Sequence, residues 1–231
     1  MIDSLRGGLI VSCQAYPGEA LRDPRAMSLI AMSAAAGGAA GIRAQGIADI
    51  TLIRELIALP LIGLLKVGDG DVFITPTLAH AIAVAEAGAD IVAIDGTRRE
   101  RPDGLTLAET IRAIHETTGA LVMADAGSLE DGQSAQDAGA DIVGTTLSGY
   151  TGARPRTIGP DFELISEMVT TLSVPVFAEG RIRTPAQASE ALDRGAYAVV
   201  VGTAITHPTS ITSWFVDALN REPLFTGVAN D

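Results

Sequence analysis

One pattern occurs four times along the chain: an alanine-rich stretch ends in a small-residue turn, and an apolar run follows at once. Aligned on Gly37, Gly88, Gly139 and Gly195, the copies lie 51, 51 and 56 residues apart. Each interval has room for two strand–helix units, which is the spacing of a repeated architecture. Further apolar runs near 8–14, 61–66, 120–125 and 175–180 bring the number of predicted strands to eight.

These runs are continuously apolar and do not alternate with polar residues, as expected when both faces of a parallel sheet are covered. Strands that alternate with helical stretches also indicate a parallel sheet. Eight such units in 231 residues predict one α/β domain over residues 1–231, a closed (β/α)8 TIM barrel. An open, doubly wound sheet is the alternative. Ser128 and Thr184 are predicted helix N-caps, and the repeated glycines are predicted helix C-caps.

Composition excludes several classes of protein. The longest apolar stretch, 56–65, contains Pro60 and is too short to cross a bilayer, so no membrane association is expected. A formal net charge of −12 argues against nucleic acid as a partner. Cys13 is the sole cysteine, which rules out an intrachain disulfide and a thiolate metal cluster. The first residues lack a signal-peptide layout, so a cytoplasmic protein is expected.

In a barrel of this kind the active site lies at the carboxyl ends of the strands. The residues on which the apolar runs stop are therefore the candidates. They are Gln14, Arg43, Lys66, Asp95, Asp125, Thr145 with Thr146, Glu179, and Gly202 with Thr203. We expect most of them to line one pocket.

Lys66 is the only lysine among sixteen basic residues. An ammonium loses its proton near neutral pH if its surroundings help, whereas a guanidinium does not, so Lys66 is a candidate general base. Glu179 ends the seventh predicted strand and is expected at the same mouth. Burial would favour the neutral amine, whereas an ionised Glu179 nearby would favour the ammonium. A structural salt bridge between the two and a Schiff-base role for Lys66 remain alternatives.

The last two predicted strands end in glycine steps. Barrels frequently bind phosphate with the loops after strands 7 and 8 and a short extra helix. "GTAIT" is predicted to be that helix, with Gly180, Arg181, Gly202 and Thr203 holding the phosphate. The histidine positions give a metal centre little support, and no dinucleotide-binding glycine motif is present. Neither a metal nor a cofactor is therefore expected.

Motifs along the chain resemble those of the bacterial N-acetylmannosamine-6-phosphate 2-epimerases. They are "GLIVSCQA", "GIRAQG", "IGLLK", "VFITPT", "AGADIVAIDGTRRERP", "GADIVGTTLSGYT", "PDFELI", "PVFAEGRIRTPAQA" and "VVVGTAIT". The resemblance extends from about Leu5 to Phe215, and the combination of "TTLSGYT" with "AEGRI" is specific. It implies a cofactor-independent barrel isomerase of sialic acid breakdown that converts N-acetylmannosamine 6-phosphate to N-acetylglucosamine 6-phosphate.

The resemblance also implies roles for individual residues. Lys66 and Glu179 match the family's acid and base residues, and inversion at carbon 2 of the open-chain sugar would proceed by removal and return of a proton. The positions that match substrate-binding residues or lie in the "TTLSGYT" motif are Gln14, Arg43, Asp125, Thr146 and Tyr150.

The chain departs from the family pattern in three places. It reads "AIDGT", "ADAGS" and "AITHP" where the family usually reads "ALDAT", "ADCST" and "AITRP". The last change puts His207 where the family has an arginine that helps to neutralise the phosphate, and histidine is largely neutral at pH 7. We expect His207 at the phosphate, with Arg181 compensating for the lost charge.

Two other functions fit the same residues. The first is a Schiff-base aldolase that uses Lys66 on a different phosphorylated sugar, and the second is a non-catalytic sensor of sugar phosphates. In each case the expected partner is a small amino-sugar phosphate or a close analogue. A homodimer is expected because dimers are common among barrels of this kind.

Overall fold

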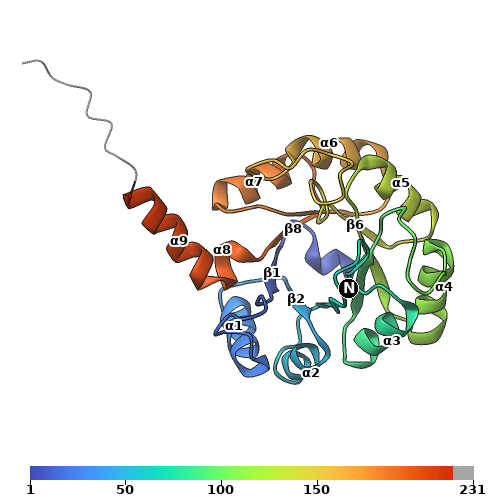
Figure 1. Cartoon of the computed structure of the whole chain (residues 1–231), viewed down its shortest axis with the longest axis horizontal. Coiled ribbons are helices and arrows are strands. Elements are labelled where there is room, and N and C mark those ends of the chain that lie inside the picture. The colour runs from blue at the N-terminus through green and yellow to red at the C-terminus, as the bar shows by residue number, and fades with distance from the viewer. Residues whose placement is uncertain (221–231) are drawn as a thin grey trace, which may run out of the picture.

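The eight apolar runs form eight parallel strands in the computed structural model, which describes residues 1–220 (Figure 1). The strands pair in chain order, and the last closes against the first. They are β1 (Leu9–Cys13), β2 (Gly41–Gln45), β3 (Leu61–Leu64), β4 (Ile91–Asp95), β5 (Leu121–Asp125), β6 (Ile142–Gly144), β7 (Val176–Glu179) and β8 (Ala198–Val201). The prediction of a closed (β/α)8 TIM barrel is confirmed. Residues 221–231 of the predicted domain lie outside the described part.

Helices surround the barrel on its outside (Figure 1). They are α1 (Pro24–Ala36), α2 (Ile47–Leu56), α3 (Leu78–Glu86), α4 (Leu107–Thr118), α5 (Leu129–Asp137), α6 (Phe162–Thr171), α7 (Pro185–Asp193), α8 (Thr203–Thr206) and α9 (Pro208–Leu219). Ser128 and Thr184 cap α5 and α7 as predicted. The predicted short helix after β8 is α8, and α9 extends away from the barrel (Figure 1). Among residues 1–220, no helix combines the length and apolar character that a membrane span requires.

The repeated glycines end helices, but the alignment of the first copy was wrong by one residue. Gly88, Gly139 and Gly195 have φ angles of +109°, +96° and +93°, which favour glycine. In the first copy Gly37 has φ −75° and continues the right-handed turn, whereas Gly38 has φ +94°. Gly38 is therefore the equivalent residue, because it is where the chain must turn from α1 into β2.

The core has two layers, one inside the barrel and one between the strands and the helices. Inside the barrel, Ile10, Ile62, Met123 and Phe177 come from different strands and are fully buried. Leu5, from the short 3₁₀ helix at Ile2–Leu5, packs into the same cluster. The interior is thus filled by side chains, as is usual in this fold.

Five of the eight predicted strand ends differ from the observed ones. Gln14, Thr145 and Gly202 follow directly after the last residues of β1, β6 and β8. Lys66 stands two residues beyond the end of β3. β2 continues past Arg43 to Gln45, so Arg43 lies inside the strand and the prediction that the strand stops there was wrong. The physical reason is that Arg43 faces carboxylates of β5 and β7, which allows a charged side chain within a buried strand.

Candidate active site

A cavity of about 540 Å³ opens at the carboxyl ends of the strands. Eleven of the fourteen candidate residues line it. They are Gln14, Arg43, Lys66, Thr146, Tyr150, Glu179, Gly180, Arg181, Gly202, Thr203 and His207. The other three, Asp95, Asp125 and Thr145, are buried and do not line the cavity. The barrel therefore brings side chains from both ends of the sequence to one space.

Arg43 connects two carboxylates beneath this space. Its guanidinium binds Asp125 in a bidentate manner, with N–O distances of 3.1 and 2.6 Å, and its Nη1 also lies 2.9 Å from Glu179 Oε2. Both Arg43 and Asp125 are almost completely buried. Burial disfavours the charged guanidinium, but the two carboxylates outweigh it and raise the pKa of Arg43. The structure thus places Asp125 as a support for Arg43.

Glu179 is poised to exchange a proton near neutral pH. Burial raises the pKa of its carboxyl to about 7, against the opposing effect of the Arg43 guanidinium. The Thr146 hydroxyl donates to Asp125 Oδ1 at 2.6 Å and lies 3.2 Å from Glu179 Oε2. A carboxyl with this pKa is present in both protonation states at neutral pH, as general acid–base catalysis requires.

The amine of Lys66 lies in the same cavity as Glu179. Burial is the main cause that lowers the pKa of Lys66, and the positive charge of Arg43 lowers it further. Glu179 and Asp125 act in the opposite direction, but the net shift is downward. Among residues 1–220, Lys66 Nζ forms no ion pair with either carboxylate. The competition between burial and Glu179 that the sequence left open is thus decided in favour of burial.

Gln14 presents an unused acceptor to the site. Its Nε2 donates to Ser12 Oγ at 2.8 Å, which fixes the orientation of the amide. Its Oε1 is buried and has no partner within the described residues. A buried acceptor without a partner costs free energy, so Gln14 is prepared to receive an N–H or O–H group from a ligand.

Four of the lining residues contribute backbone amides that are not used by the fold of residues 1–220. Those of Gly180, Arg181, Gly202 and Thr203 donate to no backbone acceptor within the described part of the chain. Gly180 has φ +112°, and Arg181 has φ +57°, a conformation that non-glycine residues adopt only rarely. Successive N–H groups in such turns form a concave surface that suits an anion.

The side chain of Arg181 binds a neighbouring loop through three hydrogen bonds. Its Nε donates to Gly159 O at 2.9 Å, its Nη1 to Ser148 O at 2.7 Å, and its Nη2 to Thr157 Oγ1 at 3.0 Å. All three acceptors belong to the loop between β6 and α6. The guanidinium therefore holds that loop, and this leaves one N–H each on Nη1 and Nη2 besides the backbone N–H.

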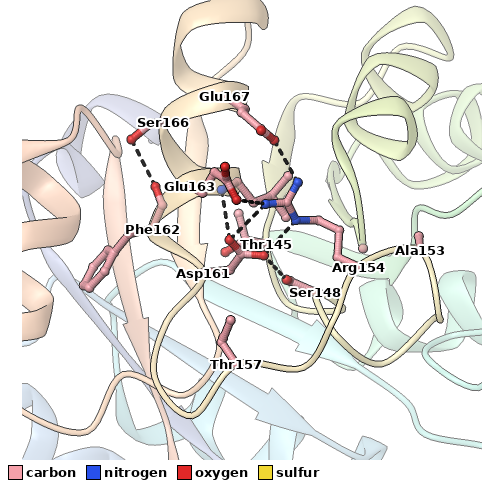
Figure 2. A network of polar contacts seen from close by, with 12 residues as sticks. Thr145, Ser148, Ala153, Arg154, Thr157, Asp161, Phe162, Glu163, Ser166 and Glu167 are labelled. Carbon is pink, nitrogen blue, oxygen red and sulfur yellow. Dashed lines mark hydrogen bonds and ion pairs between the residues drawn. The ribbon is translucent and has the colours of Figure 1, made fainter.

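Arg154 binds the same loop and the start of α6 (Figure 2). Its guanidinium bonds to Asp161 at 2.9 Å, to Glu163 at 2.9 Å and to Glu167 at 3.0 Å. Ser148 also donates to Asp161, at 2.6 Å. Since Thr146 and Tyr150 begin this loop, the two arginines position the wall of the cavity that carries them.

His207 is buried at the cavity wall between α8 and α9. The Tyr16 ring meets its ring edge-on at 4.6 Å between centroids. Its Nδ1 lies 3.5 Å from Glu19 Oε1 and has no hydrogen-bond partner within the described residues. The loop after β1 thus covers the histidine.

Sequence reasoning missed several lining residues, among them Ser12, Tyr16, Arg156, Arg183 and Trp214. Ser12 could have been found, because it precedes Gln14 by two residues and so shares its side of the strand. Arg156 and Arg183 could have been found as basic residues in loops after strands of an acidic chain. Trp214 stacks under Arg183 at 4.9 Å from the ring centroid, a pairing that only the tertiary structure creates.

The charge of the cavity opposes that of the whole protein. Five basic side chains and one carboxylate are among its lining residues, although the chain has a formal net charge of −12. Within residues 1–220, no group of three histidine, cysteine, aspartate or glutamate side chains is arranged to hold a metal ion. The mouth of this closed parallel barrel holds both an amine of lowered pKa and a carboxyl of raised pKa. This combination is typical of a (β/α)8-barrel enzyme.

Comparison with known proteins agrees with this class. The family described as putative N-acetylmannosamine-6-phosphate epimerase matches residues 27–221. A protein of Cutibacterium acnes named putative N-acetylmannosamine-6-phosphate 2-epimerase is 58% identical, with 95% of this chain and 96% of the relative covered. The chain belongs to the N-acetylmannosamine-6-phosphate epimerase family, and it is an isomerase.

The structural comparison leads to the same family. The solved structure of the N-acetylmannosamine-6-phosphate 2-epimerase from Clostridium perfringens matches with a TM-score of 0.91 and 44% identity, covering 94% of this chain and 96% of that one. A thiamine phosphate pyrophosphorylase from Pyrococcus furiosus matches with a TM-score of 0.61 and 20% identity, covering 92% of each chain. The second likeness concerns the fold alone.

Proposed function

We propose that this protein interconverts N-acetylmannosamine 6-phosphate and N-acetylglucosamine 6-phosphate, as a step in the breakdown of sialic acid. The observation that supports the proposal most directly is the shared cavity of Lys66 and Glu179, with Arg43 between the carboxylates. Inversion at carbon 2 requires the ring to open to the aldehyde, a base for the proton on carbon 2, and a donor for the enolate oxygen.

In this proposal the neutral amine of Lys66 removes the proton from carbon 2. The C–H electrons form the enolate, whose oxygen is stabilised by the Arg43 guanidinium and the protonated Glu179. Return of a proton to the opposite face of carbon 2 gives the epimer, and the Lys66 ammonium and the Glu179 carboxyl are the two donors in the cavity. Gln14 receives a donor group of the sugar, such as the acetamido N–H.

The phosphate would lie on the backbone amides of Gly180, Arg181, Gly202 and Thr203. Its charge suits the excess of basic side chains in the cavity, which concentrates anions in an otherwise acidic protein. Among these basic groups, Arg156 and Arg183 lie at the mouth without an ion pair in the described residues, so both are free to draw an anionic ligand inward.

The test of this function is isotope exchange at carbon 2 in heavy water. With N-acetylmannosamine 6-phosphate, the protein should produce N-acetylglucosamine 6-phosphate that carries deuterium at carbon 2. The unphosphorylated sugar should react more slowly if the phosphate site is used. Binding of the sugar phosphate without any deuterium at carbon 2 would reject the epimerase and favour a sensor.

Replacing His207 by arginine should lower the Michaelis constant for the phosphorylated sugar. A guanidinium carries a permanent charge and several N–H donors, and residue 207 lines the cavity. The expected change is at least about tenfold, which corresponds to the lower end, about 1.5 kcal/mol, of a hydrogen bond to a charged group. His115→Arg on α4, which does not line the cavity, is the matched control. An unchanged or higher Michaelis constant for the His207 variant would show that this residue does not contact the phosphate.

The expected homodimer has a specific basis in α9. None of the side chains of α9 is buried, and Phe215 and Leu219 are 70% and 83% exposed. With Ile211 they repeat every four residues and form one apolar stripe. Only His207 separates α8 from α9, and α9 extends away from the barrel (Figure 1).

An apolar groove of about 350 Å³ remains on the barrel wall near α9. It is lined by side chains of β1, β8, α7 and α8, including Leu9, Leu192, Val199, Val201 and Ile205. Elsewhere in the barrel such a wall is covered by a helix. We propose that α9 of a second copy covers it, reciprocally, in a symmetric dimer.

Replacing Phe215 by aspartate should weaken this dimer at least about tenfold, which corresponds to about 1.4 kcal/mol. Sedimentation equilibrium over a range of protein concentrations measures the change. Ser213→Asp, on the opposite side of the helix, adds the same charge outside the stripe and should leave the dissociation constant near that of the wild type. A wild-type chain that stays monomeric at all concentrations would disprove the proposal that each copy covers the groove of the other with its α9.

A further inference from the structure

Lys66 is not held by the hydrogen bonds of the barrel. β3 ends at Leu64, and its register with β4 comprises only Ile62 opposite Ile91 and Gly63 opposite Val92. Beyond these pairs the two strands separate. A general base must be placed to within a fraction of an ångström, so some other part of the chain has to fix this residue.

A short segment, Phe73–Thr75, fills the gap between the ends of β3 and β4. We call it the inserted segment. On the β3 side, Val67 N donates to Phe73 O at 3.0 Å, and Lys66 forms an antiparallel bridge with Ile74. On the β4 side, Asp95 N donates to Ile74 O at 2.9 Å. The backbone of Lys66 is therefore fixed by this segment.

Thr75 is the residue that joins both sides. Its N–H donates to Leu65 O at 2.7 Å, its hydroxyl accepts from Leu65 N at 3.1 Å, and the same hydroxyl donates to Ala93 O at 2.7 Å. Thr75 is fully buried, and its φ is +45°. A β-branched residue in this region is an outlier that costs about 1 to 3 kcal/mol and persists only where its surroundings hold it.

Arg101 holds Thr75 in this conformation. Its Nη2 donates to Thr75 O at 2.8 Å, and its Nη1 donates to Asp95 O at 2.9 Å. The side chain is buried, and within the described residues it forms no ion pair. Burial lowers the pKa of Arg101 despite the charges of Asp103 and Asp95. A buried cation that binds only carbonyl groups is costly, so its placement calls for a reason beyond stability.

We propose that Thr75, held by Arg101, is a positioning residue that fixes the amine of Lys66 in the cavity. The inference rests on the proposed function, in which Lys66 is the base. Neither Thr75 nor Arg101 lines the cavity, so both act through the backbone of Lys66 and not through the substrate. The unfavourable φ angle of Thr75 is then a free-energy cost that accompanies the placement of Lys66, which lies beyond the hydrogen-bonded part of β3.

The test compares Thr75→Val with Thr75→Ser. Valine keeps the shape and β-branching of threonine but removes the hydroxyl that bridges Leu65 and Ala93, whereas serine retains it. We expect Thr75→Val to lower kcat about ten- to a hundredfold while KM changes less than about threefold, because a misplaced base loses turnover and not binding. Thr75→Ser should restore kcat to near the wild-type value.

The lone lysine provides a readout besides activity. In protein labelled with ¹³C at the ε-carbon of lysine, Lys66 gives a single resonance whose pH titration reports its pKa. If the Lys66 amine is held less firmly, water should reach it and reduce the effect of burial on its pKa. The titration midpoint should therefore move upward in Thr75→Val and in a second variant, Arg101→Gln. Arg112→Gln, at an exposed position of α4, is the matched control and should titrate as the wild type does.

The outcomes separate this inference from the proposed function. If Lys66→Ala retains activity, Lys66 is not the base and the proposed function fails. If Lys66→Ala is inactive while folded Thr75→Val and Arg101→Gln match the wild type in kcat and in the Lys66 titration, only the positioning role fails. If both variants lose the circular dichroism spectrum of the barrel, the two residues serve the fold and the positioning role is likewise overturned.

Discussion

Lys66→Ala is expected to lower turnover of N-acetylmannosamine 6-phosphate at least about a hundredfold, the lower end of what loss of a general base costs. The amine lines the cavity and has a lowered pKa, whereas alanine has no group to take the proton from carbon 2. Turnover is measured by ¹H NMR of the sugar, and deuterium uptake at carbon 2 should fall in parallel. The far-ultraviolet circular dichroism spectrum should match that of the wild type.

Controls for this prediction distinguish the rival roles of Lys66. Borohydride should trap no substrate on the wild-type protein, because epimerisation forms no imine, whereas a Schiff-base aldolase would become labelled at its only lysine. Thr212→Ala, at an exposed position of α9, should retain wild-type turnover as a matched surface change. Near-normal turnover by folded Lys66→Ala would reject the assignment.

Arg43→Met is expected to lower the free energy of unfolding by about 3 to 5 kcal/mol, the usual effect of removing one partner from a buried ion pair. Methionine fills part of the volume, but it leaves the fully buried Asp125 and the nearly buried Glu179 without the cation that both contact. Urea denaturation, followed by circular dichroism, measures the change.

The double variant Arg43→Met with Asp125→Asn tests the cause. An amide needs no cation, so it should recover part of the stability lost by the single variant, and a double-mutant cycle gives the coupling energy. Arg112→Met on the exposed face of α4 should stay within about 0.5 kcal/mol of the wild type. A loss of less than about 1 kcal/mol for Arg43→Met would show that the buried carboxylates do not depend on it.

The strands were predictable because their apolar runs reflect burial on both faces, a property that is local to each run. Their ends were less predictable. Gly37 and Gly38 are adjacent glycines, and only the backbone shows which one has the left-handed conformation. Arg43 interrupts an apolar run, yet it lies within β2, because its partners Asp125 and Glu179 come from strands about 80 and 136 residues further along the chain.

Most residues of the candidate site could be predicted from the sequence, but the contacts of their side chains could not. Strand order alone puts Gln14, Lys66 and Glu179 at one mouth, since the carboxyl ends of parallel strands in a barrel converge. Their chemical roles remain proposals. The guanidinium of Arg181 bonds to the loop between β6 and α6, and Asp125 is buried against Arg43 and does not line the cavity. Both placements depend on hydrogen bonds between residues that are distant in sequence.

The amino-acid sequence by itself determined the eight strand–helix units, the end of the sheet at which the polar strand ends meet, and the presence of a single lysine there. These follow from periodicity and residue type, which are local quantities. Only the tertiary structure decided the lowered pKa of Lys66, the raised pKa of Glu179, the support from Arg43 and Thr75, and the unpartnered face of α9. Burial and charge–charge distances produce these features, and neither exists until segments far apart in the chain are packed together.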